Sequence, residues 1–152
     1  MYARLISPPS RSSFFVFGPR GTGKSSWVRT RYPGALYLDL LDADVYTDLL
    51  VSPARLRRFF TGSGLPPQVI LDEVQKVPAL LDEVHRLIES GGIQFIMTGS
   101  SARKLRRAGV NLLAGRALTL SLFPLTAREL GGDFDLRRSI ANGMLPAALG
   151  HE

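Results

Sequence analysis

The 152-residue chain contains no cysteine, so it can form neither a disulfide nor a thiolate metal site. It also lacks any apolar run close to the roughly 20 residues that a membrane-spanning helix needs. The first apolar stretch, FFVF at residues 14–17, is too short for the core of a signal peptide. From these absences we expect a cytoplasmic protein that makes no membrane contact.

Lysine is scarce, because three lysines and sixteen arginines make up the 19 basic residues. The net charge is +6 and the isoelectric point is about 10.3, which raises the question of nucleic acid. The densest basic runs are RKLRR at residues 103–107 and RLRR at 55–58. Neither run is interleaved with aromatic residues that could stack on bases, so solvated helix faces are the favoured interpretation.

Short apolar runs alternate with helix-like segments along the whole chain, and no repeat or linker interrupts them. The runs that predict strands are residues 13–18, 35–40, 68–73, 93–99 and 117–123. The segments that predict helices are 24–32, a stretch after Ser52 and Pro53, 78–91, 101–107, and a short piece capped by Thr126 and Glu129. This alternation predicts an α/β fold with helices on both faces of a parallel sheet, in a single domain over residues 1–152.

Residues 18–25 read GPRGTGKS and satisfy the pattern G-x-x-x-x-G-K-[ST], between a predicted strand and a predicted helix. Glycines in such a loop let successive backbone N–H groups approach a phosphate at the positive end of the helix dipole. The lysine then reaches the β- and γ-phosphates, and the hydroxyl after it can bind Mg²⁺. The predicted nucleotide-binding residues here are Gly18, Pro19, Arg20, Gly21, Thr22, Gly23, Lys24, Ser25 and Ser26.

An acidic pair, Asp72 and Glu73, ends the apolar strand VIL. The carboxyl ends of parallel strands line the ligand crevice of such a sheet. There Asp72 could hold Mg²⁺ and Glu73 could activate a water toward the γ-phosphate. The alternative is that the pair only opens the next loop, and its match with the phosphate loop favours the functional interpretation.

Two further candidates follow along the chain. The fourth predicted strand ends in TGSS, where Thr98 or Ser100 could contact the γ-phosphate or the attacking water, although a helix cap would explain these hydroxyls equally well. Arg116 precedes the fifth predicted strand and could reach the γ-phosphate of a neighbouring subunit. Its spacing alone favours an ordinary surface arginine.

Four motifs together resemble a known family: the loop GPRGTGKS, then VILDE, FIMTGSS and LAGRALTLSLFPLTARE in the same order. The chain is similar to prokaryotic AAA+-type ATPases whose P-loop core is followed by a C-terminal domain of unknown function. The resemblance implies a sheet of order 5-1-4-3-2, ATP and Mg²⁺ as ligands, and hydrolysis of ATP. It assigns Lys24 and Ser25 to the phosphates, Asp72 to the metal, Glu73 to the base and Arg116 to an arginine finger. Family members usually continue past GMLPAALGHE, so the resemblance also implies a chain shortened to the core.

Three functions are compatible with these observations. The first is a slow ATPase that couples its nucleotide state to conformation or to a partner. The second is a kinase for a nucleotide or another small molecule, although Glu73 next to Asp72 suits water activation better. The third is a nucleotide-gated module that binds nucleic acid or protein through RKLRR and Arg137–Arg138.

Overall fold

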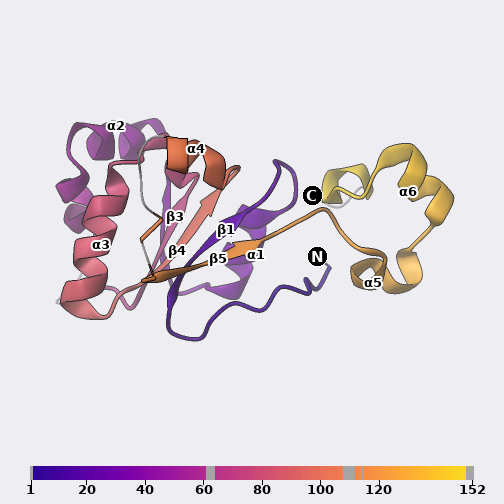
Figure 1. Ribbon diagram of the computed structural model, residues 1–152, viewed down its shortest axis with the longest axis horizontal. Coiled ribbons are helices and arrows are strands. Elements are labelled where there is room, and N and C mark those ends of the chain that lie inside the picture. Colours follow the sequence, from indigo (N-terminus) through magenta and orange to yellow (C-terminus); the bar gives the residue numbers. More distant parts are fainter. Residues whose placement is uncertain (1, 61–63, 108–111, 114, 150–152) are drawn as a thin grey trace.

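The computed structural model describes residues 2–60, 64–107, 112–113 and 115–149 (Figure 1). Its strands are β1 (Ser13–Phe17), β2 (Leu36–Asp39), β3 (Gln68–Asp72), β4 (Gln94–Gly99) and β5 (Ala117–Ser121). Its α-helices are α1 (Lys24–Arg31), α2 (Ala43–Val51), α3 (Leu80–Gly91), α4 (Ala102–Arg107), α5 (Ala127–Leu130) and α6 (Leu136–Asn142). The 3₁₀ helices are η1 (Pro53–Phe59), η2 (Val74–Lys76), η3 (Gly131–Asp133) and η4 (Pro146–Leu149).

The five strands form one sheet in the order β2-β3-β4-β1-β5, and every pairing is parallel. This is the predicted order 5-1-4-3-2 counted from the opposite edge, so the predicted fold is confirmed. Phe17 at the end of β1 is in register with Gly99 of β4 and Ser121 of β5. Asp39 of β2 is likewise in register with Asp72 of β3. The carboxyl ends of all five strands therefore lie along one edge of the sheet.

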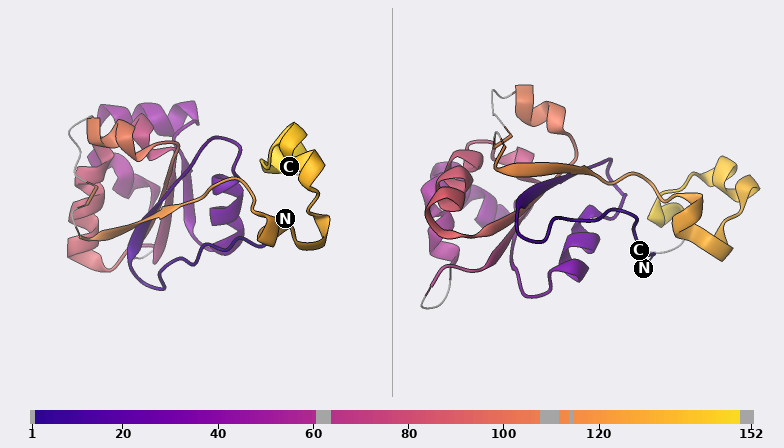
Figure 2. Two further views of the ribbon diagram at one scale, coloured as in Figure 1. Left: turned by 45° about the vertical axis from the view of Figure 1, so that its right-hand side comes forward. Right: turned by 60° about the horizontal axis from the view of Figure 1, so that its bottom comes forward.

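Helices cover both faces of the sheet, but unequally. Phe15 and Phe17 point into the larger core, which contains residues of α2, η1, α3 and α4. Phe14 and Val16 point to the other face, where Val28 of α1 completes a smaller core. Figures 1 and 2 show α1 on the opposite side of the sheet from α2 and α3. The result is a three-layer sandwich, as predicted.

The predicted helix after Ser52 and Pro53 is a 3₁₀ helix, and the Ser52 side chain makes no capping hydrogen bond. The regular helix of this region, α2, lies earlier and was not predicted. Asp42 caps it by accepting hydrogen bonds from the N–H groups of Asp44 and Val45. An aspartate at the N-cap position is a signal for the start of a helix, and the pattern of apolar residues alone did not reveal it.

Beyond β5 the chain leaves the sheet and forms a C-terminal segment, residues 123–149, that contains α5, η3, α6 and η4 (Figure 2). The predicted capping box is present, because the Thr126 hydroxyl accepts from the N–H of Glu129 and the Glu129 carboxylate accepts from the N–H of Thr126. Glu129 also accepts from Nε of Arg4 at 3.0 Å, and the two side chains are only 4% and 6% exposed. This buried pair joins the segment to the N-terminal residues of the chain.

The Arg4–Glu129 pair gives a testable pH dependence. Burial opposes ionisation of Glu129, but N–H donors from Leu5 and Thr126 and the charge of Arg4 outweigh it, so the pKa of Glu129 lies below its usual value. A carboxylate with a lowered folded pKa stabilises the fold above its unfolded pKa of about 4.3 and loses that effect as the pH falls through the folded pKa. We expect Glu129→Gln to lower the free energy of unfolding at pH 7 by about 1.5–3 kcal/mol, the range for a hydrogen bond to a charged group.

Urea denaturation at pH 7 and in acid measures this effect. The difference between parent and variant should shrink as the pH falls below about 4, the range in which glutamates become protonated. Glu89→Gln is the matched control, because Glu89 also pairs with an arginine but its side chain is 52% exposed, and we expect little change. A difference for Glu129→Gln that is equally large in acid would contradict the prediction.

Candidate functional site

The loop of residues 18–23 joins β1 to α1 and needs glycine at specific points. Gly21 and Gly23 have φ angles of 80° and 83°, in the left-handed region that side chains disfavour. A Cβ atom on Gly18 would lie 2.0 Å from the carbonyl oxygen of Leu122. The backbone therefore curls tightly beside the start of α1, where the N–H groups of the first helical turn have no helical partner.

Lys24 begins α1 and turns back into this loop. Its side chain is buried, and Nζ donates to the carbonyl oxygens of Gly18 at 2.8 Å and Pro19 at 2.9 Å. Burial lowers the pKa of Lys24, and attraction from Glu73 and Asp72 opposes that shift. The ammonium group is thus held inside the loop and close to both members of the acidic pair.

The remaining residues of the predicted loop differ in exposure. Thr22 is buried and its hydroxyl donates to the carbonyl oxygen of Pro19, so it stabilises the loop itself. Arg20 and Ser26 are exposed, and Ser25 is half-buried in the first turn of α1. Ser25 is therefore accessible to a ligand above the loop.

Asp72 lies at the carboxyl end of β3 and is 3% exposed. Both of its carboxylate oxygens accept hydrogen bonds from hydroxyl groups: Oδ1 from Thr98 of β4 and Oδ2 from Tyr37 of β2. Burial, and then the hydrogen bond to Asp72, raise the pKa of the Tyr37 phenol far above its ordinary value. Tyr37 therefore stays protonated and acts as a donor. Sequence reasoning missed Tyr37, because it looks like an ordinary strand residue in ALYLDL.

Glu73 follows Asp72 with a φ angle of 60°, unusual for a residue with a side chain. Its N–H donates to the Thr98 hydroxyl at 3.1 Å. The amide of Gln75 donates to its carboxylate and lies 3.4 Å from the hydroxyl of Ser100. A Cβ on Gly99 would lie 2.8 Å from Gln75 Oε1, so the glycine leaves room for this amide.

The two candidate hydroxyls at the carboxyl end of β4 thus occupy different places. Thr98 is fully buried and connects Asp72 with the backbone of Glu73. Ser100 is half-buried and lies beside Gln75 and Glu73. Gln75 is part of the same cluster.

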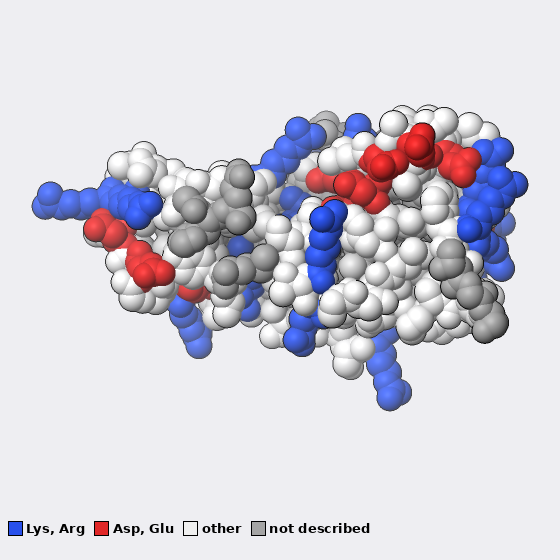
Figure 3. Space-filling model, turned by 180° about the vertical axis from the view of Figure 1, so that it is seen from behind, with Lys and Arg blue, Asp and Glu red and all other residues white. Residues whose placement is uncertain are grey.

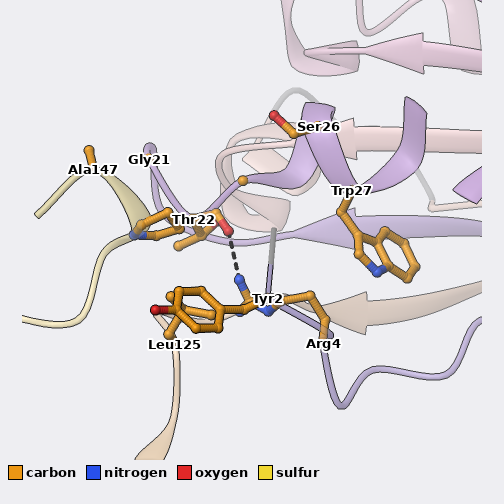
Figure 4. Close-up of a pocket in the computed structure, with 10 residues that line it drawn as sticks. Tyr2, Arg4, Gly21, Thr22, Ser26, Trp27, Leu125 and Ala147 are labelled. Carbon is orange, nitrogen blue, oxygen red and sulfur yellow. Dashed lines mark hydrogen bonds between the residues drawn. The ribbon is translucent and has the colours of Figure 1, made fainter. Parts of the chain in front are cut away.

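A cavity of about 340 Å³ adjoins the phosphate loop (Figure 4). Its lining residues are Tyr2, Arg4, Gly21, Thr22, Gly23, Ser26, Trp27, Leu125, Pro146 and Ala147. Arg4 donates to the carbonyl oxygen of Thr22 at 2.9 Å, the contact drawn as a dashed line in Figure 4, and also to that of Phe123. The wall of the cavity is mostly apolar and comes from both ends of the chain, which no local sequence pattern could have predicted.

Arg116 is not part of this arrangement within the chain. It directly precedes β5, at the amino ends of the strands, whereas the phosphate loop follows the carboxyl end of β1. Five strand residues at about 3.3 Å each separate those two edges. Arg116 instead binds Glu89 of α3, with Nε and Nη2 at 2.9 and 2.6 Å from Oε1.

Basic side chains do not form one continuous surface on the face shown in Figure 3, where a band of acidic side chains lies among them. In the run 55–58, Arg55 pairs with Asp48 and Arg57 with Glu83. The run RKLRR forms α4, but the side chains of Lys104 and Arg107 lie outside the described residues.

No group of three or more His, Cys, Asp or Glu among the described residues is arranged to hold a metal ion. No helix in the described part of the chain is long and apolar enough to cross a membrane.

Comparison with known proteins agrees with this geometry. The Walker-type ATPase PABY2304 of Pyrococcus abyssi has a similar structure, with a TM-score of 0.56 and 15% sequence identity. The similarity covers 90% of this chain, which spans 60% of the length of that one. No curated protein sequence matches the chain. The family described as AAA domain matches residues 10–131, and the chain belongs to that family.

Proposed function

We propose that the protein binds ATP together with Mg²⁺ and hydrolyses the γ-phosphate. The observation that supports the proposal is that Lys24 is buried in the loop and that Asp72 and Glu73, at the carboxyl edge of the sheet, both attract its ammonium group. Family membership supports a nucleotide as the ligand. The match to a Walker-type ATPase supports the fold in which such a site is found.

The phosphates would lie on the N–H groups of the loop and the first turn of α1. Lys24 would then exchange its two carbonyl contacts for phosphate oxygens, which bind an ammonium more strongly because they are charged. The donor set also suits Mg²⁺, which prefers oxygen ligands and keeps several waters. Ser25 and Asp72 would hold the ion beside the β- and γ-phosphates, where its charge offsets the charge of the triphosphate.

For hydrolysis, Glu73 would accept a proton from the attacking water. The water oxygen forms the new bond to the γ-phosphorus as the bond to the bridging oxygen breaks, and ADP leaves. Gln75 donates a hydrogen bond to the Glu73 carboxylate and lies 3.4 Å from the Ser100 hydroxyl, and Ser100 would contact the water or the γ-phosphate. Thr98 is too deeply buried for that contact, so we assign the sensing role to Ser100.

The cavity beside the loop would hold the adenine and ribose. It adjoins Thr22, Gly23 and Trp27, so a nucleotide with its phosphates on the loop would extend into it. Leu125 and Pro146 line its opposite wall and belong to the C-terminal segment. A nucleotide bound there would thus contact both the segment and the loop and draw them together. Arg4 donates hydrogen bonds to both, which supports a coupling of the nucleotide state to the position of the segment.

Lys24→Ala tests the phosphate assignment. Loss of a charge-assisted hydrogen bond worth roughly 1.5–3 kcal/mol should weaken Mg-ATP binding about tenfold to a hundredfold. Isothermal titration calorimetry measures the affinity. Lys76→Ala is the matched control, because Lys76 is exposed on η2, and it should bind as the parent does. Equal affinities for the Lys24 variant and the parent would contradict the assignment.

Glu73→Gln separates binding from hydrolysis. The amide keeps the size of the side chain but cannot accept a proton, so ATP should bind as before while turnover falls by roughly 10²–10⁴-fold. Phosphate release under saturating ATP measures the turnover. Asp72→Asn should instead weaken Mg²⁺ dependence and binding together. If Glu73→Gln hydrolyses ATP at the parent rate, Glu73 is not the base.

Arg116 leads to a separate prediction about self-association. An arginine finger can raise phosphoryl transfer by 10³-fold or more. Because Arg116 lies at the opposite edge of its own sheet, it could act only on a neighbouring copy. We expect turnover per chain to rise with protein concentration in the parent and to stay low in Arg116→Ala. Turnover independent of concentration in both proteins would exclude this role.

A further inference from the structure

Tyr37 is the least expected member of the acidic cluster, because it belongs to none of the nucleotide motifs. It lies on β2 in register with Ile70 of β3, and Ile70 and Asp72 are two residues apart. Alternate residues of a strand share a face of the sheet, so Tyr37 and Asp72 lie on the same face as α1. From there the Tyr37 hydroxyl donates to Oδ2 of Asp72.

The ring that carries this hydroxyl is held on two sides. It packs against the smaller core on the α1 side of the sheet, as Trp27 and Tyr32 also do. The guanidinium of Arg29 lies over it at 3.9 Å from the ring centroid. Arg29 belongs to α1, the helix that begins with Lys24. A hydroxyl fixed in this way keeps its direction at little additional cost in side-chain entropy.

Asp72 is therefore held by donors from both neighbouring strands, Tyr37 on β2 and Thr98 on β4. Each carboxylate oxygen has two lone pairs, so one hydroxyl donor on each leaves a second lone pair for a further ligand. Partners of this kind orient a metal ligand, and their loss typically costs 10- to 100-fold in metal affinity or activity.

We propose that Tyr37 is a positioning residue that fixes the Asp72 carboxylate for the Mg²⁺ bound with ATP. The inference rests on the proposed function. Arg29 acts one step further away, because its stacking holds the Tyr37 ring. Helix α1, which follows the phosphate loop, and Asp72 at the carboxyl end of β3 are thereby connected through a side chain of the edge strand β2.

Tyr37→Phe tests the proposal, because it removes only the hydroxyl and leaves the ring for Arg29. Calorimetry of ATP binding is carried out over a series of Mg²⁺ concentrations and in EDTA. We expect the Mg²⁺ concentration at half-maximal enhancement of binding to rise about tenfold, at the lower end of the range for such partners. ATP affinity in EDTA should stay unchanged. Tyr32→Phe is the matched control, since Tyr32 lies in the same core and should leave both values as in the parent.

Two further variants separate positioning from other roles. In an Asp72→Asn background, Tyr37→Phe should have no further effect on Mg²⁺ dependence, because a pair that acts as one unit is not additive. Arg29→Met frees the ring but keeps the hydroxyl, and should give a smaller shift in the same direction; it also tests the proposal if Tyr37→Phe does not fold.

The outcomes that overturn the proposal are distinct. A lower thermal stability of Tyr37→Phe with an unchanged Mg²⁺ midpoint would show a structural role only. A loss of ATP affinity in EDTA would show direct contact with the nucleotide. If the parent itself binds no ATP, with or without Mg²⁺, the proposed function fails first, and that failure is visible before any variant is compared.

Discussion

The buried carboxylate of Asp72 is the constraint on which the site depends. A charge removed from water is tolerated only when hydrogen bonds and an opposite charge replace the lost hydration. Here the donors come from strands on either side of β3, and the opposite charge is Lys24 at the end of the loop after β1. Four strands must therefore be in their parallel register before the carboxylate is satisfied, so correct folding of the sheet and assembly of the site are the same event.

The fold and the phosphate loop were predictable because their signals are local. Buried strands leave short apolar runs, and a loop that turns at Gly21 and Gly23 before a lysine leaves a fixed spacing. Tyr37 and Arg4 could not be found in this way. Their roles arise from contacts made across strands or between distant parts of the chain, up to 125 positions apart for Arg4 and Glu129. Helix α2 differs from these residues, because its start signal, the cap at Asp42, is local. The prediction relied on the apolar pattern rather than on this cap and therefore missed the helix.

The C-terminal segment has an unusual relation to the rest of the molecule. Few of its own side chains are buried, and Leu136 and Ile140 are 62% and 78% exposed. Its attachment relies on Arg4, on the hydrogen bond from the Tyr2 hydroxyl to the carboxylate of Asp133, and on Leu145 near Gly21. A segment held by a few polar contacts opens at lower cost than one held by a large apolar core. This is the property that a part moved by a bound nucleotide requires.

The left-handed backbone of Glu73 has a consequence for the evolution of this sequence. Such a conformation costs a residue with a side chain on the order of 1 kcal/mol or more, and glycine avoids that cost. Selection for stability alone would therefore favour glycine at position 73. On the proposed function, in which Glu73 is the base, a glycine at this position in a related sequence would mark a protein that keeps the fold without that base.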